Sequence, residues 1–111
     1  MIYKERDADS HQNLHSGKGE VAINKLLGKN DVEGLDLFAT VTVPPGGSIG
    51  YHQHLEDSEG YYILSGAAEF TDADGKTKAV ERGDLCLITQ GQSHGIKNIG
   101  ETELKILAIV F

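Results

Sequence analysis

Cysteine and tryptophan are almost absent from this sequence of 111 residues, which has one cysteine, Cys86, and no tryptophan. A single cysteine cannot form an internal disulfide, and this predicts a reducing compartment. The N-terminus shows no basic segment followed by an apolar stretch, so we expect no secretory signal and a cytoplasmic location. Cys86 lies in the apolar run of residues 85–88, which favours a small buried side chain over a reactive thiol.

Long apolar runs and clusters of positive charge are also missing. The longest apolar run covers residues 106–111, whereas a membrane span needs roughly 20 residues, so we expect no membrane partner. The sequence contains ten Lys and Arg but seventeen Asp and Glu, which gives a net charge of −7. Such a surface repels phosphate backbones, and we therefore expect no nucleic-acid partner.

No stretch of ten or more residues carries a helical stripe. Short apolar runs instead alternate with turns that contain glycine, a pattern that predicts an all-β sandwich or barrel. We expect strands at residues 20–27, 35–43, 48–54, 59–65, 67–71, 76–81, 84–88, 93–98 and 103–111. The length fits one domain. We therefore predict one barrel domain at residues 20–111, preceded by a polar arm at residues 1–19 that is either loose or laid on a partner subunit.

Three of the five histidines stand in an arrangement that points to a metal site. His52 and His54 are two residues apart, so on a strand both side chains leave the same face. Glu59 begins the next expected strand, and His94 lies in a later one. Three imidazoles and a carboxylate suit a first-row divalent ion. The other two histidines, His11 and His15, fall in the polar arm, and we interpret them as ordinary surface residues.

The spacing around these residues forms two blocks. The first block is Gly46, five residues, His52-Gln53-His54, four residues, Glu59, six residues and Gly66. The second block is Gly83, five residues, Thr89-Gln90-Gly91-Gln92-Ser93-His94, three residues and Asn98. Together they resemble the two signature motifs of the cupin superfamily, over about half of the chain. The second motif departs once, because Thr89 stands where the family usually has proline.

The resemblance implies a double-stranded β-helix, a jelly-roll-like barrel. It also implies one divalent transition metal per chain, bound by His52, His54, Glu59 and His94, with Mn, Fe, Ni or Zn as the candidates. Three neutral imidazoles and one carboxylate leave the ion a charge of about +1. An octahedral ion would keep two open positions, which favour small ligands rich in oxygen, such as carboxylates, keto acids or sugars. Thr89 predicts a softer turn and no loss of metal.

The motifs do not choose one reaction, because a single fold supports many functions. The leading hypothesis is a metal-dependent enzyme that acts on a small carboxylate or a carbohydrate-derived molecule, as an isomerase, a lyase or decarboxylase, or a dioxygenase. The alternative is a non-catalytic module that binds metal or a small ligand. Tyr61 shares the face of Glu59 and is the candidate proton donor. The alternative is that Tyr61 is an aromatic side chain that only fills the barrel. Glu59 is a catalytic candidate if it is more than a ligand.

The C-terminal strand is apolar on both faces. Leu104, Ile106, Ala108 and Val110 share one face, while Leu107, Ile109 and Phe111 share the other. A strand that is apolar on both faces is usually covered on both. We therefore predict a homodimer with residues 103–111 or the arm at its interface, the arm of the same chain being the alternative cover.

Overall fold

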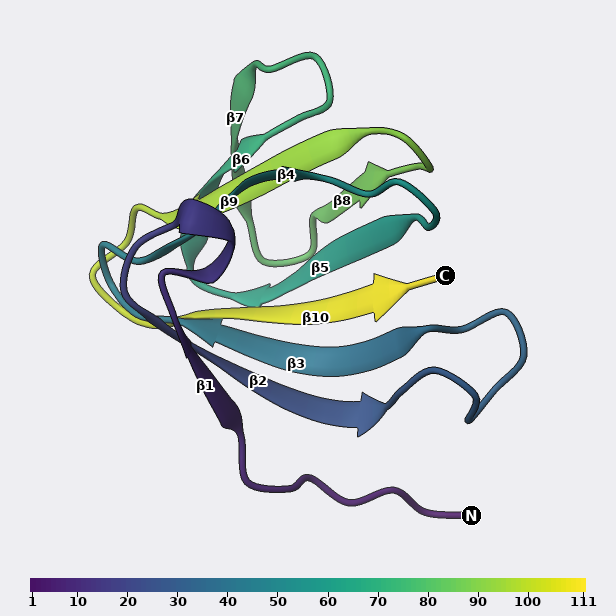
Figure 1. Ribbon diagram of the computed structural model, residues 1–111. Coiled ribbons are helices and arrows are strands. Elements are labelled where there is room, and N and C mark those ends of the chain that lie inside the picture. Colours follow the sequence, from purple (N-terminus) through teal and green to yellow (C-terminus); the bar gives the residue numbers. More distant parts are fainter.

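Two antiparallel sheets face each other in the computed structural model, which describes all 111 residues (Figure 1). One sheet has the strand order β1-β2-β3-β10-β5-β8, and the other has the order β4-β9-β6-β7. The elements are β1 (Asp9–Gln12), the 3₁₀ helix η1 (Leu14–Ser16), β2 (Glu20–Leu27), β3 (Leu37–Val43), β4 (Ser48–Gln53), β5 (Glu59–Ser65), β6 (Ala67–Thr71), β7 (Thr77–Glu81), β8 (Leu85–Ile88), β9 (Ser93–Asn98) and β10 (Leu104–Val110). This is a double-stranded β-helix, so the predicted fold class is confirmed.

The hydrophobic core fills the space between the two sheets. In β10 the inward face is buried from Leu104 to Val110, while Lys105 on the opposite face is exposed. Alternation with a period of two produces this pattern because successive side chains of a strand point to opposite faces. Fourteen buried residues form one cluster: Val21, Val41, Val43, Ile49, Tyr61, Ile63, Ala68, Phe70, Cys86, Ile88, Ile96, Leu104, Ile106 and Ala108.

Cys86 belongs to this core, as its apolar surroundings predict, and it forms no disulfide. Burial raises the pKa of its thiol to about 11, so the thiolate is scarce at neutral pH. No helix in the structure combines the length and the hydrophobicity that crossing a bilayer requires.

The nine strands expected from the sequence are all present, with ends that differ by at most two residues. The largest difference is at β3, which begins at Leu37 and not at residue 35. Leu35 instead closes a turn, in which its backbone N–H donates to the carbonyl of Val32. The alternation of apolar residues continues through this turn, which is why the pattern extended the strand too far.

The N-terminal segment contains structure that the side-chain pattern does not indicate. We expected residues 1–19 to be loose or laid on a partner, yet β1 pairs with β2 of the same chain and η1 lies against β4 (Figure 1). All four residues of β1 are exposed. An edge strand that is held by backbone hydrogen bonds alone shows no apolar alternation, so nothing in the side-chain pattern marks it.

Candidate metal centre

The four predicted ligands come from three strands that meet inside the barrel. His52 lies in β4, His54 directly follows that strand, Glu59 begins β5 and His94 lies in β9. His52 and His94 are direct partners in the pairing of β4 with β9. The two histidines of the first block and the histidine of the second block are therefore neighbours across one ladder, although 42 positions separate His52 from His94 in the sequence.

A β-bulge in β4 determines which way His52 points. From the Ile49 pair to the His52 pair, β4 advances three residues while β9 advances only two. The extra residue turns His52 toward the interior that Ile49 also faces, and Tyr51 is left half exposed on the other side. A strict period of two would have placed Ile49 and His52 on opposite faces.

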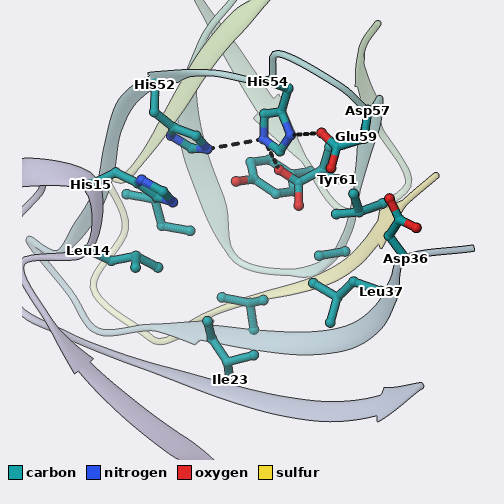
Figure 2. A pocket seen from close by; sticks show the side chains of 14 residues that line it. Leu14, His15, Ile23, Asp36, Leu37, His52, His54, Asp57, Glu59 and Tyr61 are labelled. Atoms are coloured by element: carbon teal, nitrogen blue, oxygen red, sulfur yellow. Dashed lines mark hydrogen bonds and ion pairs between the residues drawn. The ribbon is translucent and has the colours of Figure 1, made fainter. Parts of the chain in front are cut away.

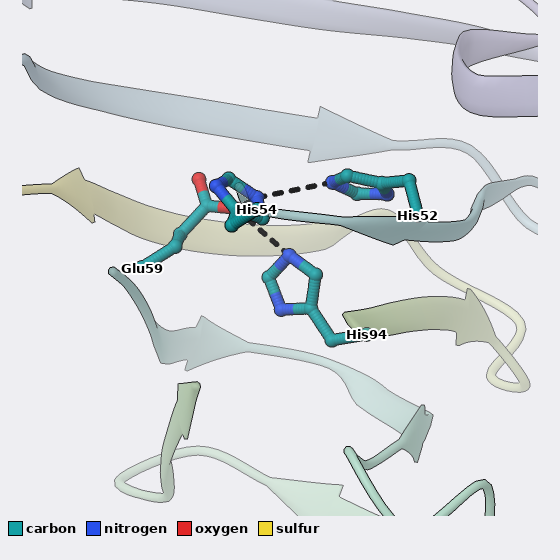
Figure 3. A group of neighbouring side chains, drawn as sticks. All are labelled: His52, His54, Glu59 and His94. Atoms are coloured by element: carbon teal, nitrogen blue, oxygen red, sulfur yellow. Dashed lines mark hydrogen bonds and ion pairs between the residues drawn. The ribbon is translucent and has the colours of Figure 1, made fainter. Parts of the chain in front are cut away.

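The ligand atoms of the four residues all lie within 4.8 Å of one another. His54 Nε2 is 3.2 Å from His52 Nε2 and 3.0 Å from Glu59 Oε1, and His94 Nε2 is 2.9 Å from the same oxygen (Figure 3). Nitrogen and carboxylate donors at this spacing can close around one small ion. The structure thus brings together all four residues that the motifs single out.

Hydrogen bonds on the far side of two rings fix how they face the centre. The Nδ1–H of His54 donates to Asp57 Oδ1 over 2.6 Å, and the Nδ1–H of His52 donates to the carbonyl of Gly50 over 2.7 Å. A proton on Nδ1 leaves the lone pair on Nε2, which is the nitrogen that points to the centre in both rings. Asp57 and Gly50 therefore orient the ligands without touching the ion themselves.

The buried ring of His94 tests whether a metal fits this cluster. Its side chain is fully buried, and neither ring nitrogen has a hydrogen-bond partner, since the approach to Glu59 lacks hydrogen-bond geometry. Leaving buried polar atoms without partners costs free energy. The ring is held in place by Tyr61, which stacks on it at 4.6 Å, and by Phe70, which meets it edge-on. A metal bound by Nε2 would satisfy this otherwise unpaired nitrogen, so the residues fit the ion.

The protonation states also suit metal binding. Burial lowers the pKa of His52 to about 4, and this outweighs the carbonyl of Gly50, which raises it. The ring is therefore neutral at neutral pH, the form that binds metals. Burial, reinforced by the negative charge of Glu59, raises the pKa of Tyr61 well above its usual value. Tyr61 accordingly keeps its proton and can act as a donor.

The cluster forms one side of a pocket with a volume of about 330 Å³ (Figure 2). Apolar side chains of β2, β3 and β10 form the opposite wall, and η1 closes one end. No lysine or arginine lines the pocket. Lys97 and Lys105 are both exposed. The pocket is lined by Leu14, His15, Ile23, Asp36, Leu37, Val41, Ile49, His52, His54, Asp57, Glu59, Tyr61, Ala108 and Val110.

Two residues of the second motif have structural roles. The backbone N–H and the hydroxyl of Thr89 both donate to Gln92 Oε1, so the turn keeps its shape without proline. Asn98 is buried, donates to the carbonyls of Val43 and Thr102, and thereby ties the end of β3 to the loop before β10.

Two pocket residues were missed from the sequence. His15 is exposed, as we expected of a surface residue, but its ring also stacks on His52 with ring centroids 3.7 Å apart. Nothing in the polar sequence around it indicates this contact. Asp57 was also missed, although an acidic residue three positions after His54 is a signal that a search for partners of the ligands would have found.

Comparison with known proteins agrees with this geometry. The cupin domain family model matches residues 39–110, which is more than half of the chain. The chain is a cupin. A protein from Thermotoga maritima named oxalate-binding protein is 42% identical over 99 residues, which cover 88% of this cupin and 81% of the relative. An uncharacterised protein from Methanocaldococcus jannaschii is 37% identical over 86 residues, covering 77% and 68% of the two chains.

Solved structures extend the comparison to the whole cupin fold. A crystal structure from Thermotoga maritima, described as a predicted oxalate decarboxylase, superposes with a TM-score of 0.95 at 38% identity, over 100% of this chain and 98% of the other. A polyketide cyclase from Streptomyces resistomycificus superposes with a TM-score of 0.76 at 23% identity, over 99% and 79%. At that level of identity the second match shows the shared fold alone.

Proposed function

We propose that this cupin binds one divalent transition metal through His52, His54, Glu59 and His94, and that the bound ion binds a small carboxylate of the oxalate type. The observation that carries the proposal is the convergence of four ligand atoms within 4.8 Å at a pocket of about 330 Å³. This volume is at the lower end of the range for small-molecule sites. The oxalate-binding relative from Thermotoga maritima supports the class of ligand.

The chemistry of the donors favours such a ligand. When bound, the ion supplies a Lewis-acidic centre with a net charge of about +1 and two positions that the chain does not fill. Oxalate, whose two carboxylates are joined directly, can occupy both positions with two oxygens and is attracted by the positive charge of the ion. An apolar wall that includes Ile23, Leu37 and Val110 lies across the pocket from the cluster. Mn, Fe, Ni and Zn all remain candidates for the ion.

The metal is tested first, by elemental analysis of protein reconstituted with Mn²⁺. We expect about one ion per chain in the wild type. His52→Ala and His94→Ala should lose most of it, because each removes a ligand, whereas Glu59→Gln should lose less, because an amide oxygen can still coordinate. His11→Ala is the matched control and should keep the ion, since His11 lies in the exposed strand β1. Folded wild-type protein that takes up no ion would overturn the proposal.

The ligand is tested by isothermal titration of oxalate into the same protein. We expect binding to the Mn²⁺-loaded form and none after chelation. Equal binding before and after chelation would contradict a role for the ion. Acetate, which offers one carboxylate, serves as the comparison and should bind more weakly.

Decarboxylation is the second candidate function, and Tyr61 favours it. Oxalate would lose CO₂ by cleavage of its carbon–carbon bond, and the remaining carbon would take up a proton to give formate. Tyr61 lines the pocket, is buried and keeps its proton. Formate release that Tyr61→Phe abolishes, with metal and oxalate binding intact, would support an enzyme. Oxalate binding without formate would favour the non-catalytic binding module, with the isomerase and dioxygenase alternatives left to other substrates.

We also propose that the cupin is a homodimer. Leu107 and Ile109 on the outer face of β10 are only half buried, and Phe111 beyond them is exposed. The N-terminal segment does not cover this face, because β1 pairs at the far edge of the sheet, beyond β2 and β3. A second copy of the chain is then the cover. We further propose that the chain divides into an arm at residues 1–19 and a barrel at residues 20–111. We also propose a reducing cytoplasmic location, on the basis of the single Cys86.

A further inference from the structure

His15 lines the pocket but takes no part in the proposed metal site. It comes from η1, outside the barrel strands, and its ring lies parallel to that of His52, with 3.7 Å between centroids and 9° between planes. Figure 2 shows it at one end of the pocket, between His52 and Leu14. It is not a member of the ligand cluster. The stacking uses one face of the ring and leaves the edge, with both nitrogens, without a hydrogen bond.

The chain holds His15 there in an uncommon way. His15 adopts a left-handed backbone conformation with a φ of 52°, which residues other than glycine rarely adopt. The segment is seated by hydrogen bonds between the backbones of Lys18 and Ser48, in both directions. Two glycines permit this close contact: a Cβ on Gly17 would overlap the carbonyl of Ser48, and one on Gly50 would overlap the carbonyl of His15 itself. Both sides of the contact therefore lack a side chain where the backbones meet.

Apart from Tyr61, the other polar groups of the pocket do not offer a free donor. Asp36 and Asp57 carry acceptors only, and Asp57 is already bonded to His54. Tyr61 keeps its proton, but Glu59 beside it is an acceptor that competes for its hydroxyl. No lysine or arginine is present in the lining. An anionic ligand next to the cluster would therefore have three carboxylates near it, those of Asp36, Asp57 and Glu59, and His15 as the donor that nothing else engages.

We propose that His15 is a ligand-recognition residue, whose ring N–H donates a hydrogen bond to a carboxylate oxygen of a small dicarboxylate at the metal. The inference rests on the proposed function and adds to it a fifth side chain from outside the two motifs. A neutral imidazole always carries one N–H, so this role does not require a change of protonation. The stacking on His52 fixes the plane of the ring, which reduces the entropy lost when the ligand binds.

The test separates the hydrogen bond from the stacking. His15→Phe keeps an aromatic face against His52 but has no donor, and His15→Gln keeps a donor but no ring. His11→Phe is the matched control, from the same segment but outside the pocket lining. Each variant is loaded with Mn²⁺, its metal content is measured, and oxalate is titrated calorimetrically. A hydrogen bond to a charged group corresponds to about a tenfold or larger change in affinity.

We expect all variants to keep about one ion per chain. The Kd for oxalate should rise about tenfold or more in His15→Phe, stay within about threefold of wild type in His15→Gln, and not change in His11→Phe. Wild-type affinity in His15→Phe would overturn the inference and leave the proposed function intact. Loss of metal in His15→Phe would overturn it as well, because His15 would then act through His52. A metal-loaded wild type that binds no oxalate would overturn the proposed function and this inference together.

Discussion

At the scale of single residues, the hydrogen bonds of each imidazole decide which ring nitrogens are left for the proposed ion. His52 and His54 each have one ring nitrogen bonded to the protein and one facing the centre, whereas His94 is buried with both nitrogens unpaired. An unpaired buried polar atom is costly, and such groups in folded proteins usually have a partner. The proposed ion is the group that all three imidazoles, together with Glu59, can share.

Asp57 provides a prediction at this scale, because it orients His54 through a hydrogen bond of 2.6 Å. Asp57→Asn should weaken metal affinity by about 10- to 100-fold, the usual effect of removing the carboxylate behind a ligating histidine. Glu56→Gln makes the same change of charge in the same loop at an exposed position and should have little effect. Affinities are measured by competition with a chelator. Equal losses in the two variants would mean that net charge, and not the orientation of His54, controls affinity.

The four proposed ligands were predicted because their spacing matches the two cupin motifs. Strand alternation alone would not have been enough, because the bulge in β4 decides which way His52 points. The contact between His15 and His52 has no such signal. It depends on how the N-terminal segment crosses β4, which is decided by backbone approach at glycines and not by any side-chain pattern.

At the scale of elements, strands with one buried face are the part that the sequence predicts well. In β10 the burial of side chains alternates along the whole strand, and in β5 the strand ends directly before Gly66. Gly66 follows β5 and Gly83 lies in the turn after β7. Their φ values of 97° and 91° are ones that other residues rarely adopt, which explains why glycine stands there. The bulge in β4 is different. It changes the facing of His52 by one inserted residue, and alternation alone cannot locate such an insertion.

The seating of η1 on β4 gives the prediction for this scale. Gly17→Ala places a Cβ against the carbonyl of Ser48, so η1 should lift from β4 and take His15 out of the pocket. We expect faster hydrogen exchange in residues 13–19, a Kd for oxalate that rises as it does in His15→Phe, and unchanged metal content. Gly100→Ala is the control, because its Cβ would meet only ordinary contacts. Protection of residues 13–19 equal to that of wild type would show that η1 tolerates the added carbon.

At the scale of the whole molecule, the core does not include the proposed ion. The buried cluster of fourteen residues spans both sheets and is built almost wholly from aliphatic and aromatic side chains. A barrel of this kind is held together by apolar burial, unlike small metal-dependent domains that have little core of their own. The ion should therefore stabilise a barrel that is already formed.

Chelation tests this view of the barrel. Protein treated with EDTA should keep its β-rich circular dichroism and a cooperative thermal transition. Adding Mn²⁺ at 100 times its Kd should contribute about 2.7 kcal/mol through mass action, which raises the Tm of a domain of this size by roughly 10 °C or more. His94→Ala is the control and should lose most of the shift. A chain that unfolds when the metal is removed would show that the ligands, and not the core, hold the barrel together.

Assembly is the remaining property of the whole molecule, and the outer face of β10 decides it. Ile109 is half buried beside the exposed Phe111, so both would contact a second copy laid against this face. Light scattering at micromolar concentration should give about twice the 12.0 kDa of one chain. Ile109→Glu or Phe111→Glu should lower the mass toward one chain without loss of metal, because a buried charge without a partner is costly. Ile99→Glu changes an exposed apolar residue outside this strand and should leave the dimer intact. A wild type of single-chain mass would refute the dimer, since the N-terminal segment lies at the other edge of the sheet and leaves this face to solvent.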